Sequence, residues 1–81
     1  MHYVYLLESV AGTSRHYVGS TTDLKQRLID HNAGRSVHTA SRRPWRLVVY
    51  LGFSNQGSAL AFERYLKVGS GHAFVRRHFW N

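Results

Sequence analysis

The stretch "RHYVGSTTDLKQRLIDHNAG", residues 15–34, predicts a strand, a turn and a helix in direct succession. Residues 16–20, "HYVGS", have strand character because they contain aromatic and β-branched side chains. Residues 23–32 follow as the predicted helix. This short unit brings three chemically versatile side chains close to one another, and these are Tyr17, Arg27 and His31.

Signals at both ends limit this helix. Thr22 is the expected N-cap, and Asp23 in the first turn suits the helix dipole. Gly34 is the expected stop signal at the C-terminal end. The helix is therefore expected to span residues 23–32.

The segments around this unit complete a small α+β domain. Residues 2–9, "HYVYLLES", read as a strand, and the turn-like "VAGTSR" that follows predicts a β-hairpin with residues 16–20. Residues 35–44 read as a basic loop that ends at the one proline of the chain. Residues 45–52, "WRLVVYLG", are apolar on both alternating faces, which predicts a strand inside the sheet.

Two more helices are expected after this strand. The stretch "SNQGSALAFERYLKVGSG" predicts a helix that stops near Gly69, and "HAFVRRHFW" predicts a short basic and aromatic one. The order β-β-α-β-α-α indicates a three-stranded antiparallel sheet flanked by helices, and 81 residues make one domain, 1–81.

The charge of the chain indicates a polyanionic partner. Eleven Lys and Arg residues against four Asp and Glu give a net charge of +7. Nucleic acid is the first candidate, since neutralised phosphates release counterions, and an acidic membrane surface is the weaker alternative. The apolar run "YVYLL" is far shorter than the roughly 20 residues of a membrane span and lacks a signal peptide's basic start. We expect a cytoplasmic protein.

Composition also argues against two kinds of site. The chain has no cysteine, which excludes disulfides, thiolate nucleophiles and cysteine-based zinc sites. It has six histidines, but no two of them have the spacing that places two imidazoles on one helical face. A zinc site is therefore not expected.

Two polar residues border the apolar face of the first predicted helix. Leu24 and Leu28 mark the inward face, and Arg27 and His31 fall directly beside it. The plain alternative is a surface ion pair between Arg27 and Asp23, four residues apart, with His31 as a bystander.

A carboxylate stands within the apolar stripe of the second predicted helix. Ala59, Phe62 and Leu66 form the stripe, and Glu63 projects inside it. An isolated buried charge is costly, so either an arginine pairs with Glu63 or a cation binds it; a solvated glutamate is the plain alternative. For the aromatic residues of the hairpin, Tyr5 included, simple packing is the plain alternative.

Taken together, these residues resemble the GIY-YIG nuclease domain over nearly the whole chain. The carrying features are "YVY" at 3–5, "YVG" at 17–19, Arg27, His31 and Glu63. The stretches "YVGSTTDL", "ALAFERYLK" and "GSG" look most similar to small stand-alone members of the superfamily.

The chain departs from the family pattern at a few positions. Tyr3 stands where the first motif has glycine, and Val4 and Val18 replace isoleucines. A further asparagine near the end of the family's domain has no secure counterpart, and Asn81 is left out of the predicted site.

The resemblance implies a single-metal phosphodiesterase that acts on DNA. Glu63 would hold one Mg²⁺ or Mn²⁺, and Arg27 would bind the non-bridging phosphate oxygens. Tyr17 is the candidate general base for the attacking water, Tyr5 would position it, and His31 would relay or accept the proton. The roles of Tyr17 and His31 could be exchanged.

Five arginines outside this group are candidate phosphate contacts, with a solvated basic surface as the alternative. They are Arg35, Arg42 and Arg43 in the loop and Arg76 and Arg77 in the last helix.

The sequence leaves three function classes open. The first is a DNA endonuclease of structure-directed or low sequence specificity, as in DNA repair or processing, because so small a domain offers little surface for reading bases. The second is a non-catalytic DNA- or RNA-binding module, and the third is a protein-interaction unit. Whether a dimer or an unidentified partner protein supplies targeting also stays open.

Overall fold

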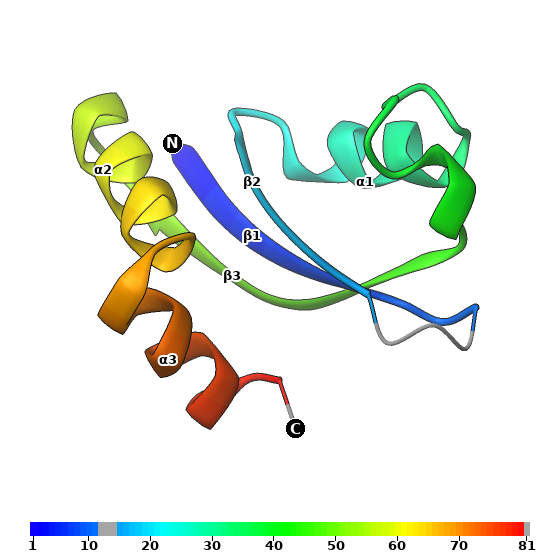
Figure 1. The fold of residues 1–81 in the computed structure, drawn as a ribbon. Coiled ribbons are helices and arrows are strands. Elements are labelled where there is room, and N and C mark those ends of the chain that lie inside the picture. Colours follow the sequence, from blue (N-terminus) through cyan, green and yellow to red (C-terminus); the bar gives the residue numbers. More distant parts are fainter. Residues whose placement is uncertain (12–14, 81) are drawn as a thin grey trace.

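The computed structural model describes residues 1–11 and 15–80. Its elements follow the predicted order β-β-α-β-α-α, with one short 3₁₀ turn added (Figure 1). In chain order they are β1 (His2–Ser9), β2 (His16–Thr21), α1 (Leu24–Asn32), the 3₁₀ turn (Ala40–Arg42), β3 (Trp45–Phe53), α2 (Gln56–Leu66) and α3 (Gly69–His78). The predicted α+β fold is confirmed. Part of the predicted hairpin turn, residues 12–14, and Asn81 lie outside the described residues.

The sheet is antiparallel and has the order β2-β1-β3, so β1 is the central strand. The prediction that residues 45–52 lie inside the sheet is therefore wrong, since β3 is an edge strand. In β1 the side chains from Val4 to Leu7 are all buried, whereas β3 buries only Trp45 fully. The apolar pattern of β3 on both faces has another cause, which is that helices cover both faces of the sheet.

Alternate residues of β1 belong to two separate core clusters. Val4 and Leu6 pack with α2 and α3 in a cluster that includes Ala59, Leu66 and Val75. Tyr5 and Leu7 point to the opposite face, where they pack with Trp45 and with leucines of α1. The molecule thus has three layers, with α1 on one face of the sheet and α2 and α3 on the other (Figure 1).

Helix α1 begins at Leu24, one residue later than predicted. Asp23, not Thr22, is the N-cap, and its carboxylate accepts a hydrogen bond from the Gln26 N–H at 3.1 Å. A carboxylate accepts this bond well and also suits the positive end of the helix, so it serves as the cap itself. Gly34, with a φ of 82°, is the predicted stop after the helix.

The end of α1 is joined to the start of β3 by one side chain. The Asn32 amide accepts a hydrogen bond from the Trp45 N–H at 2.6 Å and donates one to the Trp45 carbonyl at 3.1 Å. This pairing holds α1 against the sheet at the end where His31 lies.

Helices α2 and α3 meet more closely than the sequence suggested. The second helix ends at Leu66, and Gly69 begins α3 instead of ending α2. A Cβ at Gly71 would lie 1.8 Å from the carbonyl oxygen of Tyr65, so only glycine permits this approach. Among the described residues, no helix is long and apolar enough to cross a membrane.

Candidate active site

A line of hydrogen bonds connects Arg27 to the interior of the protein. The Arg27 Nε–H donates to the Tyr5 hydroxyl at 3.3 Å, and that hydroxyl lies 2.8 Å from Nε2 of His31. Nδ1 of His31 lies 2.7 Å from Oγ1 of Thr39, which donates to the Ser36 carbonyl at 3.5 Å. We call this line, from Arg27 to Ser36, the relay.

The ends of the relay suggest one assignment of its protons. The Thr39 hydroxyl is directed at the Ser36 carbonyl, so we assign it as the acceptor from His31 and assign the proton of the neutral imidazole to Nδ1. Nε2 then accepts from the Tyr5 hydroxyl, whose oxygen in turn accepts from Arg27. One tautomer of His31 thus satisfies every polar atom of the relay.

Burial and the neighbouring charge keep the middle of the relay uncharged. Burial, more than any other cause, raises the pKa of Tyr5 to about 12. Burial, and then the positive charge of Arg27, lowers the pKa of His31 from its usual value. At neutral pH Tyr5 is a neutral donor and His31 a neutral acceptor.

Arg27 is held by the tyrosines around it. Its pKa is raised, mainly by the hydrogen bond to Tyr5, and both Tyr5 and Tyr17 contribute electrostatically. Nε is used within the protein, so the two Nη amino groups are those left to bind an anion. The expected alternative of an ion pair with Asp23 is wrong: in the described chain the Asp23 carboxylate caps α1 instead.

Tyr17 is more accessible to solvent than Tyr5. It is half-buried, whereas Tyr5 is 1% exposed. Its ring lies edge-on to His31, with centroids 4.9 Å apart. A water molecule can therefore reach Tyr17 more easily than Tyr5 or the fully buried His31.

Gly19, which the sequence did not single out as a site residue, makes room for the relay. Gly19 pairs with Tyr5 across the sheet, and a Cβ there would lie 2.5 Å from the Tyr5 hydroxyl oxygen and 2.9 Å from the Tyr17 ring. The position of Gly19 within "YVG" was noted, but only the strand pairing shows which hydroxyl needs the space. Thr39 was also missed because nothing in a basic loop marks one hydroxyl as buried.

Glu63 lies on the other side of β2 with partners of its own. Its Oε1 accepts a hydrogen bond from the Ser20 hydroxyl at 2.8 Å, and its Oε2 forms an ion pair with Lys67 at 2.8 Å. The side chain is 19% exposed. Of the two alternatives for Glu63, an arginine partner or a bound cation, the first is wrong for the described residues. The side chain that pairs with Glu63 is Lys67, the C-cap residue of α2, one turn away.

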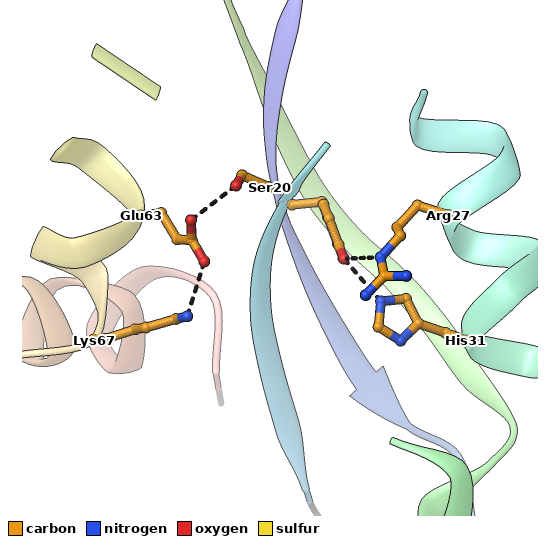
Figure 2. A network of polar contacts seen from close by, with 6 residues as sticks. Ser20, Arg27, His31, Glu63 and Lys67 are labelled. Atoms are coloured by element: carbon orange, nitrogen blue, oxygen red, sulfur yellow. Dashed lines mark hydrogen bonds and ion pairs between the residues drawn. The ribbon is translucent and has the colours of Figure 1, made fainter. Parts of the chain in front are cut away.

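Strand β2 separates these two groups of side chains (Figure 2). Tyr17 and Gly19 face α1 and the relay, whereas Val18 and Ser20 face α2. The Glu63 carboxylate is among the charges that raise the pKa of Tyr5, so the groups are within electrostatic reach of each other. A ligand at the open edge of β2 is therefore flanked by Arg27 on one side and by Glu63 on the other.

The donor set of this site fits a metal ion that keeps most of its waters. Among the described residues, no cluster of three or more His, Cys, Asp or Glu side chains could form an all-protein cage. Glu63 offers a partly exposed carboxylate that lies between Ser20 and Lys67. One carboxylate together with water and a substrate phosphate is a usual way to bind Mg²⁺.

The five predicted phosphate contacts do not form one patch. Arg35, Arg42 and Arg43 follow α1, whereas Arg76 and Arg77 lie on α3, on the other side of the sheet (Figure 1). Arg35 pairs with Asp30 at 2.8 Å, Arg43 donates to the Ala40 carbonyl at 2.7 Å, and Arg42 is half-buried. Arg76 and Arg77 are exposed.

Comparisons with known proteins show the family and the fold of this chain. The family model of the GIY-YIG catalytic domain matches residues 1–72. The solution NMR structure of the UPF0213 protein BH0048 from Bacillus halodurans is similar, with 30% identity and a TM-score of 0.57, over 96% of this chain and 85% of that one. The fold is thus shared with a solved member of the UPF0213 group.

Curated relatives include proteins of different length. The structure-specific endonuclease subunit SLX1 of Candida dubliniensis is 41% identical over 96% of this chain, which spans 28% of that protein. A UPF0213 protein of Streptococcus pneumoniae is 38% identical over 80% of the chain and 65% of the relative. One from Lactococcus lactis is 35% identical over 94% of the chain and 72% of the relative.

Proposed function

The chain belongs to the GIY-YIG catalytic domain family, a family of nucleases, and we propose that it is a metal-dependent endonuclease that hydrolyses DNA phosphodiester bonds. The observation that supports this proposal most strongly is that Arg27, held by Tyr5, and the Glu63 carboxylate lie on opposite sides of β2. A phosphodiester at this edge has a cation for its oxygens and a carboxylate for a bound metal.

Arg27 is proposed to bind the scissile phosphate. The Nε–H is fixed by Tyr5, which orients the planar guanidinium and leaves the Nη groups for two non-bridging oxygens. Charge on these oxygens is redistributed in the in-line transition state, and a positively charged donor fixed in advance stabilises it.

Tyr17 is proposed as the general base. Tyr17 is more accessible to water than Tyr5, and its hydroxyl lies within electrostatic reach of the Arg27 guanidinium. The alternative of His31 as the direct base has less support, because His31 is fully buried with both ring nitrogens bonded. Tyr5 and His31 instead hold Arg27 in place.

Glu63 is proposed to hold one Mg²⁺ or Mn²⁺. Ser20 already orients its Oε1, while Lys67 neutralises Oε2 and would exchange places with the cation. The bound ion would polarise the phosphate and stabilise the leaving oxygen.

The substrate is proposed to be DNA of a particular structure and not a long specific sequence. The relative from Candida dubliniensis is named as a subunit of a structure-specific endonuclease. The described residues form three short helices and one small sheet, and the net charge of +7 of the chain favours contact with the phosphate backbone. Targeting by a second protein is compatible with that relative's description as a subunit.

The test is cleavage of end-labelled single-stranded, duplex, flap and branched DNA in Mg²⁺, in Mn²⁺ and in EDTA. Wild type should cut at least one substrate only with metal, and Glu63→Gln and Arg27→Lys should each lose most of that activity while keeping the wild-type Tm. Lys25→Gln, an exposed change on α1, is the control and should cut normally. Binding of DNA by wild type and Glu63→Gln with no cutting by either would replace the nuclease with a binding module.

A further inference from the structure

A basic and aromatic groove runs from the candidate site along β2 and α3. A hollow lined by Tyr17, Lys67, His72 and Trp80, among others, adjoins the Glu63 side of the site. It continues into a second hollow of about 490 Å³ that shares His72 and Trp80 and adds Arg76. A third hollow, which is lined by Ala73, Arg76, Arg77 and Trp80, adjoins the second. We call the continuous surface of these three hollows the Trp80 groove.

The lining of the groove is cationic. Its exposed cations are Arg15, Lys67, Arg76 and Arg77. None of the described residues that line its three hollows is acidic. Two carboxylates lie beside the groove, and both have cationic partners. Glu63 pairs with Lys67 at 2.8 Å, and Glu8, 3.9 Å from Nε2 of His16, pairs with Arg46. Such a lining attracts a chain of phosphates.

Two stacked rings stand in the middle of the groove. The His16 and Trp80 ring centroids are 3.9 Å apart, and the ring planes meet at 14°. Trp80 packs partly against the core, is half-buried, and lines all three hollows. A partly exposed indole among arginines offers an aromatic surface to a nucleobase.

We propose that the Trp80 groove binds a single-stranded segment of DNA that leaves the candidate active site. This inference rests on the proposed nuclease function, because the groove shares Tyr17 and Lys67 with that site. A base can stack on Trp80 only if it is unpaired and unstacked from its neighbours, which favours a single strand over a duplex. Phosphates on either side of that base would contact Arg15 and Arg76.

A free single-stranded arm is, on this proposal, the feature of DNA structure that the protein recognises. The edge of β2 receives the phosphodiester at a junction, and the unpaired arm follows the groove over α3. The two arginines of α3 thus gain a defined role, as contacts to one strand. The preferred substrate is a flap or branch with a free single-stranded arm.

The experiment measures binding of a short oligothymidylate to the Glu63→Gln protein in EDTA, which excludes cutting. Tryptophan fluorescence reports stacking, since Trp45 is 5% exposed and Trp80 is the accessible one. We expect quenching on binding, and a loss of affinity of roughly 5- to 150-fold in Trp80→Leu, with far less loss in Trp80→Phe. Wild-type melting temperatures in both variants confirm that they fold.

A matched pair of charge changes tests the path of the strand. Arg76→Gln should reduce the slope of log affinity against log salt by about 0.7, the value for one phosphate contact on a single strand. Lys25→Gln removes the same charge from α1, on the opposite face of the sheet, and should leave the slope unchanged. An equal change of the salt slope in the two variants would refute the proposed path of the strand along the groove.

The outcomes separate this inference from the proposed function. The single-strand role of the groove would be refuted if Trp80→Leu kept its affinity, if no quenching occurred, or if binding of blunt duplex depended equally on Trp80. This holds even if the protein cuts branched DNA. Binding of oligouridylate without oligothymidylate would overturn the choice of DNA. Trp80-dependent binding by a protein that cuts nothing would support the groove and refute the nuclease.

Discussion

Replacing Thr39 with valine tests whether the relay holds the candidate site in place. Valine has nearly the same shape as threonine but no hydroxyl, so packing is kept while the acceptor for Nδ1 of His31 is lost. Thr39 and His31 are both 0% exposed, and water cannot easily replace the missing oxygen. The change therefore isolates one buried hydrogen bond, which is that between these two side chains.

The structure gives the size of the expected effect. A buried donor without a partner costs about 1–3 kcal/mol. The hydrogen bond from Thr39 to the Ser36 carbonyl is long, at 3.5 Å, and adds little. For a domain of this size each kcal/mol lowers Tm by about 4–8 °C, so we expect a fall of at least about 4 °C. Thr39→Ser keeps the oxygen and loses one methyl group, which costs about 0.8 kcal/mol.

Activity should follow the hydrogen bond and not only stability. In Thr39→Val the Nδ1–H tautomer of His31 loses its support, so Nε2 no longer reliably accepts from Tyr5, and Arg27 loses its fixed orientation. The assay uses saturating DNA and a temperature at which both variants are folded. Under these conditions kcat of Thr39→Val should fall about tenfold or more, which corresponds to a loss of roughly 1.4 kcal/mol of transition-state stabilisation. The DNA affinity of this variant should stay near normal. Thr39→Ser should retain most activity. Unchanged Tm in Thr39→Val, or equal kcat in the two variants, would refute the relay.

Three glycine substitutions and one pH dependence have expected outcomes that can be measured by unfolding. Gly19→Ala places a Cβ 2.5 Å from a buried tyrosine hydroxyl and should cost about 1–3 kcal/mol, whereas at Gly52 the nearest atom belongs to a flexible methionine and alanine should cost less. Gly71→Ala meets a backbone carbonyl oxygen at 1.8 Å and should be the most destabilising of the three in urea unfolding. The pKa of His31 is lowered on folding, so the unfolded chain binds more protons than the folded chain just below about pH 6.5. The free energy of unfolding should therefore decrease as the pH is lowered through this range, by at most about 1.4 kcal/mol per pH unit. His31→Gln should reduce this dependence more than His78→Gln, and equal slopes would contradict the assignment.

The elements of the fold were predictable because each follows from local chemistry. Residues 16–20 and 23–32 carry strand and helix signals that the structure follows within a residue or so. The order of strands was not predictable in this way. Residues 45–52 are apolar on both faces, and a sequence cannot tell whether helices or neighbouring strands produce that pattern.

The residues of the site were predictable as types, and their partners were not. Arg27 and His31 border an apolar helix face, and Glu63 interrupts one, which marks all three as unusual. Hydrogen-bond partners come from segments distant in sequence, such as Thr39 for His31 and Ser20 for Glu63. Small hydroxyl residues are common in loops and strands, so nothing local distinguishes these two.

The alternation of side chains along β2 explains why one short strand can serve a two-sided site. Successive residues of a strand point to opposite faces, so Tyr17 and Gly19 face α1 while Ser20 faces Glu63 on α2. Because β2 is an edge strand, both groups end at the same open border of the sheet. A central strand could not offer this, since its neighbours would cover the border. The position of β2 at the edge is therefore as important for the proposed chemistry as the side chains that it carries.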